Sequence, residues 1–309
     1  MKCNFKNFKF IFSIFIIAAA SFGIVSCDKK QHGKYAQNIT TINMPMPQLR
    51  IPSRRIWIYL PPGYEKGDKH YPVLYMHDGQ NLFDEKTSFA GQWEVGISLD
   101  RLVKEGKTGG AIVVGIDNGG EQRESEYAPW KGCSTNDSLG SIYSDFVVHT
   151  LKPYIDVNYR TLPDRDNTAV AGSSSGGNIS LYMAMRYPET FGKAMLFSPA
   201  LWCQQEENRK FLDEADMSRG VRIYMDVGTN EGEGKEPEDY VREAKHINEV
   251  LQKKEGITVK FIIDEGGQHN EKYWAKRFPE AFLWTFAENA NNAAQDGKAE
   301  NQCSVIQLM

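Results

Sequence analysis

The sequence is poor in cysteine, with five in 309 residues, and it has no excess of positive charge. Because 36 Lys and Arg stand against 40 Asp and Glu, the formal net charge is −4, which argues against a nucleic-acid-binding protein. No spacing of Cys and His matches a metal site. The ordinary fractions of hydrophobic residues (41%) and charged residues (25%) exclude a disordered chain and a polytopic membrane protein.

The first 26 residues have the features of a secretion signal. Lysines at the start precede an apolar run over residues 10–25, shorter than the roughly 20 residues that span a bilayer. The run ends in Ile-Val-Ser-Cys at residues 24–27, which resembles a bacterial lipobox. We therefore expect removal of residues 1–26, a lipid on Cys27, and a periplasmic or cell-surface protein anchored to a bacterial membrane. An ordinary signal peptide that happens to meet a cysteine is the alternative.

Removal of residues 1–26 takes away three lysines and no acidic residue, so the mature net charge falls to −7. Residues 27–38 are polar and are predicted to be a tether. Residues 39–288 are predicted to form one domain, because no repeat or linker interrupts them. The tail over 289–309, rich in Asn, Ala and Gln, is predicted to be disordered.

Short β-rich runs alternate with helical stretches in the predicted domain. Strands are expected over residues 56–60, 73–76, 111–116, 168–171, 194–197, 221–227 and 258–263. Helices are expected over 139–157, 177–186, 237–254 and 273–286, the first with Ile142, Phe146, Leu151 and Ile155 on one side. This alternation predicts an α/β fold with a doubly wound, mostly parallel sheet.

A candidate nucleophile lies between the strand at 168–171 and the next helix. Residues 171–177 read Ala-Gly-Ser-Ser-Ser-Gly-Gly, and the pattern Gly-x-Ser-x-Gly selects Ser174. A serine at a sharp strand-to-helix turn between small residues is a nucleophile elbow, which raises the hydroxyl above the sheet. Ser175 also has small residues two positions away on each side. A Gly/Ser loop that caps a helix or holds an anion is the structural alternative.

A serine nucleophile needs a base and an acid, which follow it along the chain in this fold. Only His246 and His269 follow Ser174, and His269 is the predicted base because it sits in a loop directly after the last strand. For the acid, Asp226 at the end of a strand and Glu231 in the next loop are candidates, and we favour Glu231. The predicted oxyanion hole uses the N–H groups of Ser175 and Gln80.

With these residues in place, the chain resembles the branch of the α/β-hydrolase superfamily that includes esterase D, feruloyl esterases and enterochelin esterases and, more remotely, mycolyltransferases. The matching segments lie between about residues 50 and 285, and they cover residues 55–64, 76–83, 171–177, 197–202 and 266–269. The resemblance implies an α/β-hydrolase fold, with the nucleophile at Ser174, the base at His269 and an oxyanion donor at Gln80. Many relatives have Asp where this chain has Glu231, and some siderophore esterases use Ser and His alone.

Trp93, Trp130 and Trp202 follow predicted strands and are candidate substrate contacts, with core packing as the alternative for each. Cys133 and Cys203 follow two of these tryptophans, and they are a candidate disulfide in an oxidising compartment.

The resulting hypothesis is a serine carboxylic ester hydrolase that removes acetyl or feruloyl groups from a carbohydrate, with no metal or organic cofactor. A siderophore lactone esterase and an acyltransferase are rivals within the family. A glycan-binding surface lipoprotein that keeps the elbow only as a turn is the rival outside enzymes.

Overall fold

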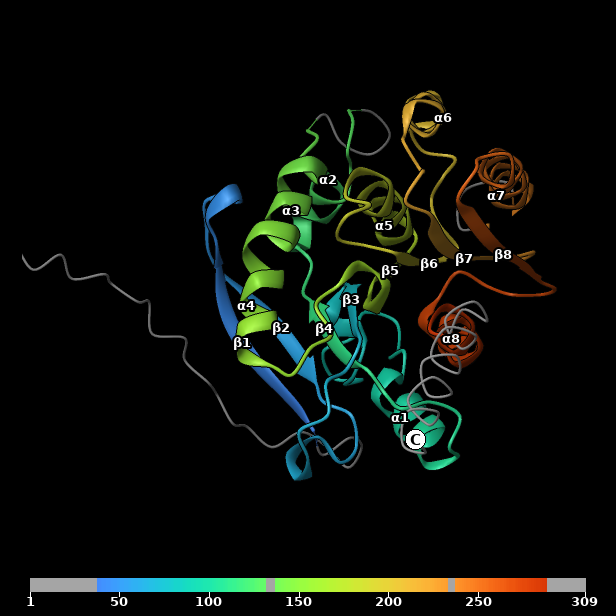
Figure 1. The fold of residues 1–309 in the computed structure, drawn as a ribbon. Coiled ribbons are helices and arrows are strands. Elements are labelled where there is room, and N and C mark those ends of the chain that lie inside the picture. Colours follow the sequence, from blue (N-terminus) through green and yellow to red (C-terminus); the bar gives the residue numbers. More distant parts are fainter. Residues whose placement is uncertain (1–37, 132–136, 233–236, 288–309) are drawn as a thin grey trace, which may run out of the picture.

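An eight-stranded sheet forms the centre of the protein in a computed structural model that describes residues 38–131, 137–232 and 237–287. The strands lie in the order β1-β2-β4-β3-β5-β6-β7-β8 (Figure 1). Their bounds are β1 Ile39–Met46, β2 Ile51–Tyr59, β3 Val73–His77, β4 Ile112–Ile116, β5 Thr168–Ser173, β6 Lys193–Phe197, β7 Val221–Gly228 and β8 Ile257–Asp264.

Six neighbouring strands are parallel to one another, namely β4, β3, β5, β6, β7 and β8. Strand β2 pairs antiparallel with both β1 and β4. The prediction of an α/β fold with a mostly parallel sheet is therefore confirmed. Parallel strands need crossovers, and helices supply them here. As a result, the carboxyl ends of β3, β5, β6, β7 and β8 all reach the same edge of the sheet.

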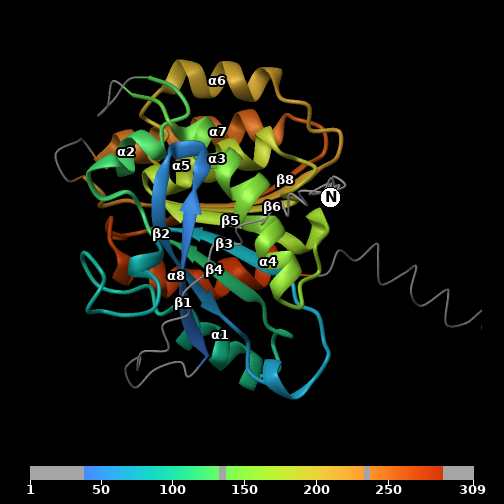
Figure 2. The same ribbon diagram turned by 90° about the vertical axis from the view of Figure 1, so that its left-hand side faces the viewer.

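Helices cover both faces of the sheet, as the two perpendicular views show (Figures 1 and 2). Helices α1 and α8 lie on one face, and α3, α4, α5 and α7 lie on the other. The α-helices are α1 Val95–Lys104, α2 Arg123–Glu126, α3 Gly140–Phe146, α4 Lys152–Asn158, α5 Ser175–Arg186, α6 Gln205–Glu214, α7 Pro237–Gln252 and α8 Glu271–Thr285. Short 3-10 turns occur at Pro47–Leu49, Tyr64–Lys66, Gly79–Asn81, Gly120–Gln122 and Arg165–Asn167.

Alternate residues of the central strands supply two hydrophobic cores. In β3, Val73 and Tyr75 pack toward α3 and α5, whereas Leu74 and Met76 pack toward α1 and α8. Because both faces are covered, every residue of β3 is buried, which explains the apolar run over its first four residues.

The predicted helix over 139–157 is present, but the prediction that four of its residues share a buried face is wrong for one of them. Phe146, Leu151 and Ile155 are buried, whereas Ile142 is 38% exposed. A π-helical turn over Val147–Leu151 joins α3 to α4 and inserts an extra residue into the helical repeat. The extra residue lets Leu151 and Ile155 share the buried side with Phe146 despite the spacing of five residues between Phe146 and Leu151. Ile142 precedes this turn and lies outside the buried face of α3, which consists of Gly140, Tyr143, Ser144 and Phe146.

The other predicted strands and helices are confirmed to within two residues at their ends, except that β2 begins five residues before the predicted strand over 56–60. Strand β1 and helices α1, α2 and α6 were not predicted. Strand β1 lies at the sheet edge and contains Pro45, and α6 is mostly polar, so neither has the apolar pattern on which the prediction relied. No helix in the described ranges combines the length and hydrophobicity needed to span a membrane.

Trp93 lies inside the core beside α1, so the core-packing alternative applies to it. Its side chain is 2% exposed, and its ring centroid lies 4.8 Å from that of Phe197 and 5.5 Å from that of Trp274. An indole enclosed in this way has no surface to offer to a substrate.

We expect Trp93→Ala to lower the free energy of unfolding by about 3 to 5 kcal/mol, because it leaves a large cavity between these rings. Urea unfolding measures this change. Phe89, which is 92% exposed, provides the control, since Phe89→Ala should have little effect. An unchanged stability with a raised KM in Trp93→Ala would instead assign Trp93 to the substrate site.

Candidate active site

Four loops at the carboxyl ends of the parallel strands carry predicted site residues. Gln80 follows β3, Ser174 follows β5, Glu231 follows β7 and His269 follows β8. Ser198, which the sequence analysis gave no role, follows β6. Ligand sites of open α/β sheets lie at this edge, where neighbouring loops diverge.

Ser174 occupies a sharp turn between β5 and α5. Its backbone has φ 55° and ψ −126°, an unusual conformation for a residue other than glycine. The Ser174 N–H donates to the carbonyl of Phe197 at 3.0 Å, and the Ser174 carbonyl accepts from Ala200 N at 3.0 Å. A Cβ atom on Gly172 would lie 2.6 Å from the carbonyl group of Gly176, so only glycine fits there. This is the strand–turn–helix geometry of a nucleophile elbow.

Glu231 and His269 are brought together from separate loops. His269 Nδ1 lies 3.3 Å from Glu231 Oε2, and the imidazole is 16% exposed whereas the carboxylate is buried. The His269 ring contacts those of Tyr240 and Trp274, with ring centroids 5.0 and 5.1 Å apart. With Nδ1 directed at a carboxylate, a neutral imidazole keeps its proton on Nδ1 and leaves the lone pair of Nε2 available to a partner.

The Ser198 hydroxyl fixes the other oxygen of Glu231. Trp274 Nε1 donates to Ser198 Oγ at 2.9 Å and Arg277 Nη2 donates to it at 3.0 Å. Neither nitrogen can accept a hydrogen bond, so both lone pairs of the hydroxyl are used. Its single proton must therefore go to Glu231 Oε1, with which Ser198 Oγ is in contact. Gly228 N donates to the same carboxylate oxygen at 2.6 Å.

Asp226, the alternative acid, is buried and contacts groups other than His269. Its Oδ1 pairs with Arg277 Nη2 at 3.0 Å and accepts from Ser198 N at 3.2 Å. Burial raises the pKa of Asp226 to about 7, and the charge of Glu231 adds to this effect, whereas Arg277 opposes it. No contact joins Asp226 to His269 among the hydrogen bonds and ion pairs of the described residues. The geometry therefore pairs His269 with Glu231.

The loop that carries Gln80 is tied to the neighbouring loops by side chains. Gln80 Oε1 accepts from Asn118 N at 3.2 Å, and the Gln80 carbonyl accepts from Thr87 Oγ1 at 2.7 Å. Asn81 Nδ2 donates to buried Glu271 Oε1 at 3.0 Å, which connects this loop to the start of α8, two residues after His269. The N–H groups of Gln80 and Ser175 lie in the first turns of their helices, where no acceptor is available within the helix.

Asp78, which is buried, and Arg123, which is partly exposed, form an ion pair beside the elbow. Arg123 Nε and Nη2 contact the two oxygens of Asp78 at 2.8 and 2.9 Å. Burial alone would raise the pKa of Asp78, but the Arg123 charge and its hydrogen bonds outweigh burial and lower it. The third nitrogen, Arg123 Nη1, contacts Glu124 Oε1 at 2.5 Å, and Glu124 Oε2 accepts from Ser175 Oγ at 2.7 Å.

The other two predicted tryptophans are half-buried. Trp130 packs against Tyr182 and Phe211, with ring centroids 5.6 and 5.4 Å apart. Trp202 packs against Tyr240, at 5.9 Å, and Tyr240 in turn contacts His269. Trp202 is therefore one aromatic ring away from the predicted base.

Cys203 is disulfide-bonded. Its predicted partner, Cys133, lies outside the described residues, as does the predicted lipidation site Cys27, so both the pairing and the lipidation stay predictions. The predicted limits of the signal, tether, domain and tail also fall at or beyond the ends of the described ranges.

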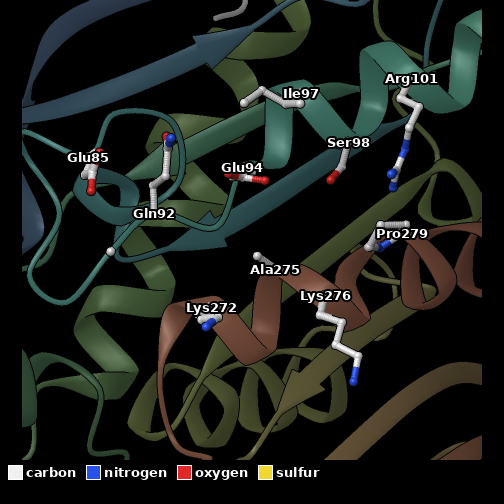
Figure 3. A pocket seen from close by; sticks show the side chains of 11 residues that line it. Glu85, Gln92, Glu94, Ile97, Ser98, Arg101, Lys272, Ala275, Lys276 and Pro279 are labelled. Atoms are coloured by element: carbon white, nitrogen blue, oxygen red, sulfur yellow. The ribbon is translucent and has the colours of Figure 1, made fainter.

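A cavity of about 510 Å³ lies between α1 and α8, and its lining includes none of the predicted catalytic residues (Figure 3). Arg101 lines it from α1, and Lys272 and Lys276 line it from α8. In the part of the chain that the structure describes, no cluster of three or more His, Cys, Asp or Glu side chains could hold a metal ion.

Sequence reasoning missed Ser198, Arg277 and Glu124. Ser198 stands in the segment over 197–202 that carries the resemblance, so a signal for it was present. No sequence signal marked Arg277 or Glu124, because each forms its hydrogen bond to a site residue that is distant in the sequence.

The order of the strands and the helices on both faces of the sheet are those of the α/β-hydrolase fold. Residues 52–285 match the protein family described as "Putative esterase", and the chain belongs to this family.

Relatives of this chain include proteins with named activities. It is 26% identical to the uncharacterized protein YbbA of Bacillus subtilis over 249 residues, which span 77% of this chain and 94% of YbbA. It is 28% identical over 226 residues to the endo-1,4-beta-xylanase/feruloyl esterase of Xylanibacter ruminicola, covering 71% of this chain and 27% of that protein. It is 29% identical over 196 residues to the iron(III) salmochelin esterase of Escherichia coli, covering 58% of this chain and 43% of that protein.

Solved structures share the fold. The BES protein from Bacillus cereus matches with a TM-score of 0.66 and 19% identity over 83% of this chain and 97% of that chain. The enterobactin esterase FES from Shigella flexneri matches with a TM-score of 0.62 and 22% identity over 82% of this chain and 60% of that chain.

We expect Ser198→Ala to lower the free energy of unfolding by about 2 to 4 kcal/mol, because it leaves the buried Trp274, Arg277 and Glu231 groups without a shared partner. Ser144→Ala is the matched control: this serine is also fully buried but donates only to the Gly140 carbonyl. Chemical denaturation of both variants measures the difference. Equal losses in the two variants would contradict the role of Ser198 as a shared partner.

Proposed function

We propose that this esterase-family protein is a serine carboxylic ester hydrolase that works through an acyl-Ser174 intermediate. The observation that carries the proposal is the Glu231–His269 pair, at the same sheet edge as the Ser174 elbow. The Ser174 hydroxyl attacks the ester carbonyl carbon, and its proton passes to His269 Nε2. Glu231 holds the imidazole in the required tautomer and stabilises the imidazolium.

The remaining steps follow from the same groups. The N–H groups of Gln80 and Ser175 stabilise the oxygen of the tetrahedral intermediate. The alcohol leaves with the proton from His269, and a water molecule, deprotonated by His269, then attacks the acyl-serine. This second attack releases the carboxylic acid and restores the Ser174 hydroxyl. The mechanism requires no metal or organic cofactor.

For the substrate, we propose an acetyl or feruloyl ester of a carbohydrate. The similarity to a protein named as a feruloyl esterase supports this choice. The half-buried ring of Trp202, which packs on Tyr240 beside His269, also supports it, because a flat aromatic face suits a sugar ring or an aryl acid. The similarity to the salmochelin esterase supports a siderophore lactone as the second candidate.

We expect Ser174→Ala to lower kcat by several orders of magnitude, on the order of 10⁶ by analogy with other serine hydrolases. Turnover should be measured on acetylated and feruloylated oligosaccharides and on a catecholate trilactone. A fluorophosphonate should add its mass to Ser174 of the native protein. Glu231→Gln should lower kcat more than Asp226→Asn does.

Three results would contradict this assignment. Uptake of the fluorophosphonate by Ser174→Ala at the native stoichiometry would move the nucleophile to Ser173 or Ser175. Hydrolysis of only the trilactone would favour the siderophore candidate. A native protein that takes up no label and hydrolyses none of the three would favour a glycan-binding protein.

We also propose that the protein is lipid-anchored outside the cytoplasm through Cys27. The apolar segment and the lipobox-like residues before Cys27 support this, and the disulfide of Cys203 suits an oxidising compartment.

In a bacterial host fed an alkynyl fatty acid, we expect the full chain to incorporate the lipid and to fractionate with membranes, because Cys27 becomes the acylated N-terminus. Cys27→Ser should lose the label, whereas Cys303→Ser should keep it. Equal labelling of the native chain and Cys27→Ser would contradict the anchor.

A further inference from the structure

A half-exposed carboxylate, that of Glu124, stands beside the elbow and has no part in the mechanism above. Glu124 Oε2 accepts from the hydroxyl of Ser175, the residue that directly follows Ser174. Its side chain is 42% exposed, whereas those of Arg123 and Asp78 are 22% and 6% exposed. Glu124 is therefore the member of this charged group that is most open to a ligand.

The position of Glu124 is set by the same arginine that holds the oxyanion loop. Arg123 uses Nε and Nη2 for Asp78, two residues before Gln80, and Nη1 for Glu124. A Cβ atom on Gly176 would lie 3.4 Å from Asp78 Oδ2, so this ion pair is packed against the start of α5. The Glu124 carboxylate is thus held in a defined position relative to Gln80 and Ser175.

A carboxylate offers about four acceptor positions, and the contacts with Ser175 and Arg123 occupy two of those of Glu124. The remaining positions can accept hydrogen bonds from hydroxyl groups. Two carboxylates and one guanidinium also give the cluster of Asp78, Arg123 and Glu124 a net negative charge. An anionic ligand would meet repulsion there, whereas a neutral polyol would not.

We infer that Glu124 is a specificity-determining residue that binds a hydroxyl group of a neutral carbohydrate ester and disfavours anionic esters. This inference rests on the proposed function and narrows its substrate class. Under it, a neutral sugar ester is a better substrate than a uronic acid ester or a ferric catecholate, because the last two carry negative charge toward Glu124.

The test uses two esters that differ only at one group: O-acetylated methyl glucoside, and the methyl glucuronoside acetylated at the same position. We expect the native protein to prefer the glucoside, and this preference should weaken at high salt. Glu124→Gln should lower kcat/KM for the glucoside by about tenfold, mainly through KM, because a charge-assisted hydrogen bond becomes a neutral one. It should also raise kcat/KM for the glucuronoside.

Two variants serve as comparisons. Glu121→Gln removes an exposed carboxylate three residues away and should leave both substrates unaffected. Glu124→Asp keeps the charge on a shorter side chain, so it should retain the discrimination against the glucuronoside while binding the glucoside less tightly. The inference is overturned if Glu124→Gln leaves the ratio of the two kcat/KM values unchanged, or if Glu121→Gln changes it equally.

Binding of both esters to Ser174→Ala separates this inference from the proposed function. In that background, addition of Glu124→Gln should weaken glucoside binding and strengthen glucuronoside binding, as measured by calorimetry, and unchanged affinities would overturn the inference. Hydrolysis by Ser174→Ala at the native rate would overturn the proposed nucleophile and leave the affinity result to decide the role of Glu124.

Discussion

The hydroxyl group of Ser198 is the interaction on which the arrangement of the site most depends. It has one proton and two lone pairs, and each is used for a buried partner from another element: Glu231 after β7, and Trp274 and Arg277 in α8. Because two of these partners can only donate, the direction of the third hydrogen bond is determined. Ser198 thereby joins the ends of β6 and β7 to the last helix, at the point where His269 meets its carboxylate.

Two arginines organise the acidic groups on the two sides of the site. Arg277 contacts Asp226 and Asp264 and approaches Glu231 Oε1 at 3.8 Å, which compensates part of the charge buried behind the imidazole. Arg123 pairs with Asp78 and Glu124 beside the elbow and compensates part of their charge. Unpaired carboxylates at such depth would be costly, so each acidic cluster requires its guanidinium. The two clusters differ in exposure, since the Glu124 side chain is 42% exposed, whereas Asp264, the most exposed carboxylate around Arg277, is 18% exposed.

Elements with a strong local sequence pattern were predicted correctly, and elements with a weak pattern were missed. The buried parallel strands have continuous apolar runs, and the elbow has glycines that its turn requires, so both could be read from the sequence. Strand β1 and helix α6 lie at the periphery and have mixed composition, which removes that signal. Ile142 was placed on the buried side of its helix because it is apolar and stands four residues before Phe146, but Tyr143 and Ser144 face the core there instead.

The sequence by itself determined the order of the elements, the turn that carries Ser174 and the short set of residues that can supply a base and an acid. These are local properties: apolar periodicity, the need for glycine at a tight turn, and the position of a polar residue just after a strand. Only the tertiary structure decided that His269 meets Glu231 while Asp226 meets Arg277, that Trp93 is enclosed, and that Glu124 reaches Ser175. Such contacts join residues that are far apart in the chain, so they depend on how strands and helices pack and not on any one segment.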